Sequence, residues 1–264
     1  MGLLFKGILK RLPLSKYYSL ISAIAISDLR LRYKNSFLGF VWTFLQPLLF
    51  LGVLYVVFSA FIGNRIQYFP LYLLLGLIIW NMFSRGTQTS MSRFMSMSGL
   101  LSKIYFPREI LPITASITTF IMMLFDLSAF VVFLIIFHFV PSSMVVYFPF
   151  LLLLLFIQTL GVSFALSVGN IYFRDLEHLW GIALQAGFFL VPIFLTLQVY
   201  PLYIRNLLYY NPMAQMIDMS HKVVLYNTLP SLHDFTYLIL VSFALLGVGY
   251  GIFKKFESKA IELL

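Results

Sequence analysis

Long apolar stretches dominate this chain and restrict it more than any other feature. Six of them cover residues 37–62, 69–87, 110–140, 144–173, 179–199 and 235–253. A membrane-spanning helix needs about 20 mainly apolar residues, and each stretch comes close to that length or exceeds it. Only 10% of the residues are charged, whereas a soluble domain carries about 25%. The sequence therefore predicts an all-α polytopic membrane protein with six transmembrane helices and excludes a soluble enzyme.

The basic residues predict how the chain is oriented. Fifteen of the 18 Lys and Arg residues lie before the first stretch, between the second and third, between the fourth and fifth, or after the sixth, if Arg85 is counted at the edge of the loop after the second stretch. The other side has only Arg65, Arg205 and Lys222. Cytoplasmic loops carry the excess of Lys and Arg. We therefore expect both termini on the cytoplasmic side of the membrane.

Two further segments do not look like spans. In residues 14–34, Leu14, Tyr17, Ile21, Ile24 and Leu31 fall on one helical seam beside basic residues. This pattern predicts an amphipathic helix on the inner membrane surface, and the alternative is a basic leader with little order. Residues 201–233 fall on the side expected to be outside and are broken by prolines. They predict re-entrant helices that pack against the protein before the last span.

The sequence offers little for catalysis or cofactor binding. It has no cysteine, and its four histidines lack the spacing of a zinc site. No glycine-rich loop for ATP phosphates is present. We expect no catalytic residue, no metal and no cofactor bound by this chain. The run Gly247–Gly251 resembles a potassium filter, but a filter needs a following span. We interpret Gly247 and Gly251 as small residues for close helix packing.

One charge lies inside a predicted span. Asp126 falls near the middle of residues 110–140. A carboxylate at the bilayer centre costs roughly 2.5–3.5 kcal/mol on insertion scales, so it must face the bundle interior, a watery path or a partner. Both a role in the transport path and a structural hydrogen-bonding role stay open.

The first span has an aromatic stripe at helical spacing, which suits either a conduit or ordinary packing. Its aromatic members are Phe37, Phe40, Phe44, Tyr55 and Phe58.

Four short motifs resemble the permeases of type-2 ABC exporters, in the branch that exports O-antigen, capsular polysaccharide or teichoic acid. They are Arg32–Gly39 with Trp42 and Gln46–Leu48, then Lys103–Ile110, Phe173–Leu176 and Tyr210–Met213. The motifs occur in the family's order and span nearly the whole chain. By this resemblance, residues 1–264 form one transporter transmembrane domain.

The resemblance implies partners and a path for the substrate. Such permeases form homodimers that bind two copies of a separate cytoplasmic ATPase, which holds the ATP and Mg. A lipid-linked glycan passes between the protomers in the cytoplasmic membrane of a prokaryote. Residues 14–34 would be the interface helix and residues 92–106 the coupling helix. No nucleic acid is expected as a partner.

The resemblance also assigns site residues. The ATPase contacts or their supports would be Asp28, Arg30, Lys103, Tyr105, Arg108, Glu109, Arg174 and Asp175. Alternatively, these charged residues only hold the chain in its orientation, as Lys and Arg in cytoplasmic loops generally do. The aromatic stripe and Asp126 would line the glycan channel.

Other functions stay open at this point. The chain could belong to an ABC exporter of a drug or a simple lipid. A membrane-embedded enzyme of lipid or sugar metabolism would need clustered catalytic polar residues, and the sequence shows none.

Overall fold

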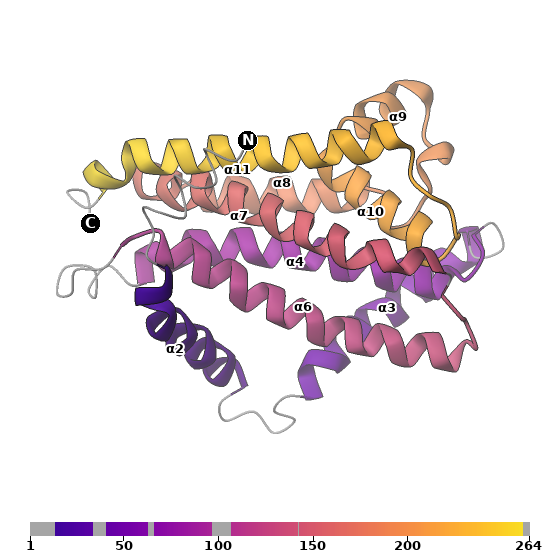
Figure 1. The fold of residues 1–264 in the computed structure, drawn as a ribbon. Helices are drawn as coiled ribbons and strands as arrows, with labels where there is room; N and C mark the ends of the chain where they lie inside the picture. The colour runs from indigo at the N-terminus through magenta and orange to yellow at the C-terminus, as the bar shows by residue number, and fades with distance from the viewer. Residues whose placement is uncertain (1–13, 34–40, 63–65, 97–106, 142, 261–264) are drawn as a thin grey trace.

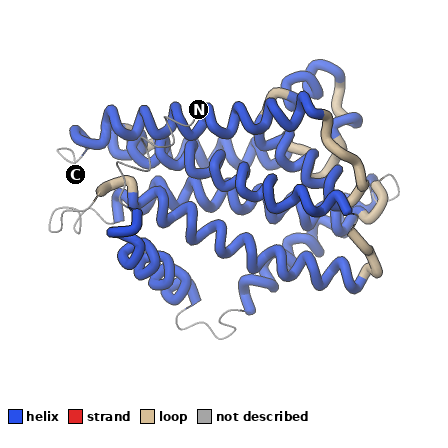
Figure 2. The backbone as a smooth tube through the Cα atoms, viewed as in Figure 1, coloured by secondary structure: helices blue, strands red, loops and turns tan. Residues whose placement is uncertain are grey.

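A computed structural model describes residues 14–33, 41–62, 66–96, 107–141 and 143–260. Within these ranges the chain is helical and contains no strand (Figure 2). The longer helices are α2 (Leu14–Tyr33), α3 (Val41–Ile62), α4 (Phe69–Ser96), α6 (Ile110–Ile136), α7 (Phe148–Tyr172), α8 (Leu176–Leu190) and α11 (Leu232–Ala260). Two short helices, α9 (Leu202–Tyr209) and α10 (Pro212–Val224), and two 3-10 turns, η1 (Ser143–Tyr147) and η2 (Leu197–Val199), complete the fold.

Four of the helical stretches are long and apolar enough to cross a membrane. They are Phe69–Phe94, Ile110–Ile136, Ser143–Tyr172 and Leu232–Ser258, and they match the second, third, fourth and sixth predicted spans. In the first predicted span, the described apolar helix is the shorter stretch Leu45–Ser59 within α3. The all-helical membrane fold is therefore confirmed, whereas the count of six spans stays a prediction.

The fifth predicted span differs most from its expected range of 179–199. The helix α8 has 15 residues and ends at Leu190. Pro192 explains this end, because a residue before proline favours an extended backbone, and Val191 is extended with ψ at 158°. The irregular stretch that follows is buried, with Ile193 fully enclosed. Non-helical backbone in a membrane protein is tolerated where protein covers it.

The second predicted span is longer than expected. Helix α4 continues past residue 87 to Ser96, because the polar residues there find partners on neighbouring helices. Residues 92–96 of the predicted coupling helix thus form the last turn of α4. The rest of that helix, 97–106, lies outside the described residues.

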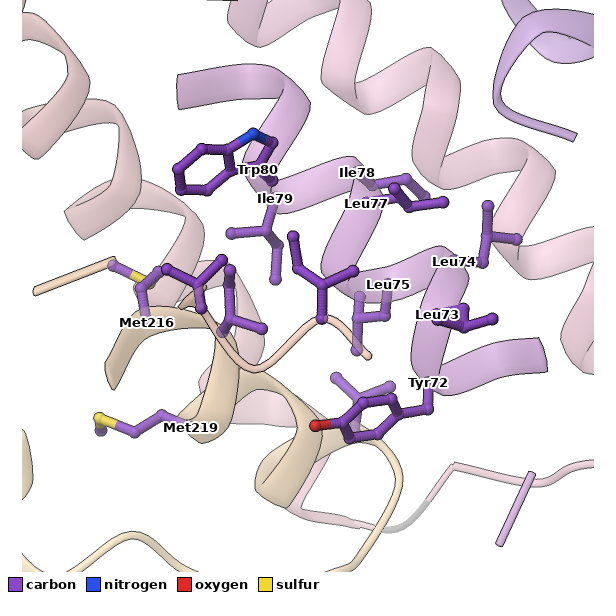
Figure 3. Close-up of a cluster of buried hydrophobic side chains, with 14 of the residues drawn as sticks. Tyr72, Leu73, Leu74, Leu75, Leu77, Ile78, Ile79, Trp80, Met216 and Met219 are labelled. Atoms are coloured by element: carbon purple, nitrogen blue, oxygen red, sulfur yellow. The ribbon is translucent and has the colours of Figure 1, made fainter. Parts of the chain in front are cut away.

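Helix α4 is the centre of the bundle. It packs against α3, α6, α7, α8 and α10, and Figure 1 shows it running through the middle of the molecule. Its first half is apolar on every side, and Leu71, Leu75 and Ile79 are fully buried. Figure 3 shows this half with Met216 and Met219 of α10 nearby. A helix that is apolar all round is one that protein surrounds.

Helices α7 and α11 approach each other closely at two glycines. A Cβ on Gly249 would overlap the carbonyl oxygen of Gly161, and a Cβ on Gly161 would lie 2.6 Å from the backbone of Leu245. A Cβ on Gly247 or Gly251 would meet nothing within 4 Å. The expected packing through Gly247 and Gly251 is therefore wrong within this chain. Gly249 lies between them in sequence and makes the contact.

The predicted re-entrant segment, 201–233, contains α9 and α10, both too short to span a membrane. Asn211 begins α10, where its side-chain oxygen accepts bonds from the amides of Met213 and Ala214, as an N-cap does. His221 on α10 stacks on the ring of Tyr72 of α4 at 3.7 Å between centroids. The segment is thus held against the bundle, while its depth in the membrane stays a prediction.

Candidate functional site

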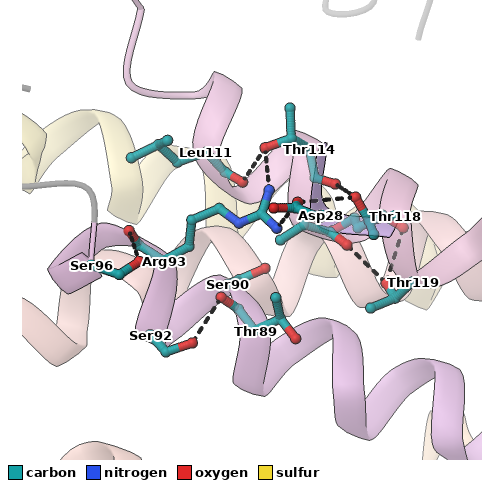
Figure 4. Close-up of polar contacts among 12 residues, drawn as sticks. Asp28, Thr89, Ser90, Ser92, Arg93, Ser96, Leu111, Thr114, Thr118 and Thr119 are labelled. Carbon is teal, nitrogen blue, oxygen red and sulfur yellow. Dashed lines mark hydrogen bonds and ion pairs between the residues drawn. The ribbon is translucent and has the colours of Figure 1, made fainter. Parts of the chain in front are cut away.

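An ion pair connects α2 to the bundle. Arg93 of α4 pairs with Asp28 of α2 and donates a bond of 2.8 Å from Nη1 to Oγ1 of Thr114 on α6 (Figure 4). Thr118, one turn along α6, donates a longer bond of 3.5 Å to Asp28. Arg93 is only 7% exposed. One guanidinium therefore joins three helices, and we call these four residues the Arg93 network.

A second polar contact joins the start of α6 to the end of α11. Glu109 is buried and pairs with Lys254, which also contacts Glu257 at 2.7 Å. Arg108 donates a bond of 2.8 Å to the backbone oxygen of Glu257. Arg108 and Glu109 were predicted as ATPase contacts or supports. The structure gives both residues partners within the chain.

Asp126 faces the bundle interior, as one of its predicted alternatives requires. Its Oδ2 lies 3.4 Å from Nη1 of Arg85 on α4, and its side chain is 2% exposed. Arg85 was expected at the edge of a cytoplasmic loop, but it lies well inside α4. Since the two opposite charges lie together, each offsets part of the cost of placing the other in the membrane.

The other predicted ATPase contacts fall into two groups. Arg30, Arg174 and Asp175 are exposed, so they are available to a partner. Lys103 and Tyr105 lie outside the described residues.

Only part of the predicted aromatic stripe of the channel lies among the described residues. Phe37 and Phe40 lie outside the described residues, and the side chain of Phe44 is not described either. Tyr55 is 42% exposed on α3. Phe58 stacks on Phe194 at 4.6 Å between ring centroids. The stripe therefore supplies some internal packing, and its role in a channel stays a prediction.

The sequence reasoning missed a polar and aromatic hollow on the surface of the bundle. It has a volume of about 360 Å³ and lies between α3, α4 and α8. Asn81, Ser84 and Gln88 reach it from one face of α4, and Gln185 reaches it from α8. Its aromatic residues are Phe50, Trp80, Phe188 and Phe189. We call this surface the α4–α8 hollow.

The spacing of three polar residues was the signal for this hollow. Asn81, Ser84 and Gln88 are separated by three and four positions, which places them on one helical face. Gln88 Nε2 donates a bond of 3.1 Å to the hydroxyl of Ser84. This helical spacing continues beyond the predicted end of the span at residue 87.

Comparisons with known proteins agree with the membrane fold. A model of the family described as ABC-2 type transporter matches residues 19–225. An O-antigen export system permease protein of Klebsiella pneumoniae is 30% identical over 251 residues, which cover 94% of this chain and 95% of that protein. One of Myxococcus xanthus is 30% identical over 256 residues, with 94% and 96% covered. A polysialic acid transport protein of Escherichia coli is 22% identical over 244 residues, with 90% and 93% covered.

Proposed function

The chain belongs to the ABC-2 type transporter family, and we propose that it is the permease subunit of an ATP-driven polysaccharide exporter. Its substrate is a lipid-linked polysaccharide such as O-antigen, capsular polysaccharide or teichoic acid. Two copies of the chain form the path across the cytoplasmic membrane. The names of its full-length relatives support this substrate class.

The α4–α8 hollow is the observation that carries the proposal. Polar residues within membrane-spanning helices face a bundle interior or a watery cavity, because lipid does not solvate them. In the single chain, Gln88 and Gln185 are exposed. A second copy that covers this face would enclose a path lined with amides and aromatic rings. Amides bond to sugar hydroxyls, and aromatic rings offer sugars a flat apolar surface.

The Arg93 network supports a route for the energy of ATP. The chain has no phosphate-binding loop, so two copies of a cytoplasmic ATPase would bind the ATP and Mg. Arg30, Lys103, Tyr105, Arg174 and Asp175 would contact that ATPase. Asp28 would pass motion of α2 to α4 and α6, and Arg108 with Glu109 would hold α6 to α11. A rigid shift of these helices would open the path. Both termini would face the cytoplasm.

Mild extraction of the tagged chain from native membranes tests this assembly. We expect an ATPase subunit to co-purify with it in equal amount, and its ATP turnover to depend on the permease. Deletion of the chain should remove polymer from the cell surface. An intact dimer without an ATPase, or surface polymer that survives the deletion, would contradict the proposal.

Variants of the hollow test the path separately. Asn81→Leu with Gln185→Leu should lower surface polymer while the ATPase still co-purifies, because the changes remove amides without disturbing the buried core. Ile182→Leu is the matched control, since Ile182 is 65% exposed on α8 and does not line the hollow. A normal amount of surface polymer in the double variant would show that the α4–α8 hollow is not part of the glycan path. Loss of a simple lipid instead of a polymer would favour the lipid-exporter alternative.

A further inference from the structure

A second polar cavity lies at the end of the bundle that carries α9. It has a volume of about 560 Å³, within the range of ligand sites. Gln67 reaches it from the segment before α4 and Gln198 from η2. Arg205 and Asn206 reach it from α9, and Lys222 from α10. Four separate parts of the chain therefore meet around one cavity.

The charges in this cavity largely compensate one another. Lys222 pairs with Asp218 one turn away on α10, at 2.7 Å, and both line the cavity. Arg205 is the remaining cationic side chain of the lining. A diphosphate needs several cations or a row of amides around it, and this lining does not supply them. The cavity thus suits a ligand with little or no charge.

The uncharged polar side chains of the cavity lining supply both donors and acceptors of hydrogen bonds. The amides of Gln67, Gln198 and Asn206 each offer both. Tyr209 donates its hydroxyl hydrogen to Asp234, and this bond together with burial raises the pKa of Tyr209 to about 12. Burial also raises the pKa of Tyr226 to about 12. Both tyrosines stay protonated at physiological pH and line the cavity as uncharged aromatic residues.

From this lining we infer that the cavity binds a short uncharged segment of a carbohydrate chain. Sugar hydroxyls are donors and acceptors at once, so mixed amides and hydroxyls match them better than a cluster of one charge does. The inference rests on the proposed function, since the exported glycan would supply the ligand.

The position of the cavity fits a contact late in transport. Figure 1 shows α9 at the opposite end of the bundle from α2, which carries part of the Arg93 network. The cavity shares no residue with the α4–α8 hollow. It would therefore hold the glycan at a second point, after the hollow on the way out.

Photocrosslinking in export-competent cells tests this inference. A photoreactive amino acid replaces Asn206 in one strain and Tyr203 in a control strain, and antibodies against the surface polymer detect adducts. Tyr203 is on the same helix, is 75% exposed and does not line the cavity. We expect a polymer adduct at position 206 and none above background at position 203. Each substituted chain must restore surface polymer in a deletion strain, which shows that it folds and assembles.

The outcomes separate this inference from the proposed function. Restored surface polymer with no adduct at 206, or with equal adducts at both positions, would contradict glycan binding in the cavity. The proposed export function would be unaffected. If added pyrophosphate removed the adduct at 206, whereas dextran of similar length did not, the cavity would be an anion site instead. If deletion of the chain left surface polymer unchanged, both the proposed export function and the inferred glycan binding would be contradicted.

Discussion

The two halves of α4 are held in the bundle by different forces. The half from Phe69 to Phe83 is surrounded mainly by apolar side chains, with Leu74 and Ile78 fully buried. The half from Ser84 to Ser96 also buries Phe94, but it adds polar bonds to neighbouring helices, chiefly those of Arg85 and Arg93. Apolar packing tolerates small shifts, because it has no preferred direction. Ion pairs and hydrogen bonds depend on angle and distance, so the polar half is the one able to report a movement of α2.

The largest expected effect comes from cutting the Arg93 network. Arg93→Ala would leave Asp28 and Thr114 without their buried partner, which costs about 3–5 kcal/mol. We expect a marked loss of thermal stability in detergent and a loss of surface polymer. Lys255→Ala is the control, since Lys255 is exposed near the end of α11 and is not among the proposed ATPase contacts.

A double variant sharpens this test. Asp28→Leu with Arg93→Met removes both charges, so stability should largely return while export stays low. Wild-type stability of Arg93→Ala alone would show that the polar half of α4 is not held as we describe.

A cavity in the apolar half should affect stability more than export. Leu75→Ala removes a fully buried side chain and should cost about 2 kcal/mol. This is the low end of the range for soluble cores, because lipid is as apolar as leucine and the transfer contribution is small. Leu240→Ala is the control, since Leu240 is 62% exposed on α11. If Leu75→Ala lost export at unchanged stability, the apolar half of α4 would have a role in transport, and the contrast between the two halves would be wrong.

The one buried histidine beside the apolar half predicts a pH effect. His221 donates from Nε2 to the carbonyl oxygen of Tyr72 at 2.9 Å, and burial lowers its pKa to about 3. The unfolded ring takes a proton near pH 6.5. The contribution of His221 to the free energy of unfolding should therefore be nearly constant above about pH 6.5. Below that pH it should fall by up to about 1.4 kcal/mol per unit.

Thermal melts between pH 8 and pH 5 measure this slope. His221→Phe should flatten it, while His178→Gln should keep it because His178 is exposed. An unchanged slope in His221→Phe would assign the acid sensitivity to other groups.

The smallest expected effect is a single hydrogen bond of the polar half. Trp180 Nε1 donates to Oγ1 of Thr87 at 3.0 Å, and a bond of this kind within a membrane bundle contributes about 0.6 kcal/mol. Trp180→Phe should lower the melting temperature slightly, and Trp42→Phe on the exposed face of α3 should not. A large loss in Trp180→Phe would indicate a packing role for the indole.

The membrane class and four of the spans follow from apolar length alone, because lipid demands long apolar helices. The helix α2 was also predictable from its pattern, and Ile21 and Ala25 of its apolar side are buried, whereas its interface role stays a prediction. The end of α8 was missed although Pro192 signalled it, since the apolar stretch continues past the proline.

The pairings of the site could not be read from the sequence. Arg85 and Asp126 are 41 positions apart, and Asp28 and Arg93 are 65 apart. Spacing arguments reach only along one helix, so they cannot tell which charge meets which across the bundle. The polar face of α4 could have been predicted from the spacing of Asn81, Ser84 and Gln88. It was not predicted because the span was expected to end at residue 87.

The pair of Arg85 and Asp126 has a consequence for how the chain enters the membrane. Each charge alone costs roughly 2.5–3.5 kcal/mol at the centre of an isolated inserted helix. Helix α4 is the least apolar of the four candidate spans, and its charge partner is synthesised only later, on α6. We therefore expect α4 to stay beside the insertion machinery until α6 emerges, so that the two helices pass into lipid as a pair.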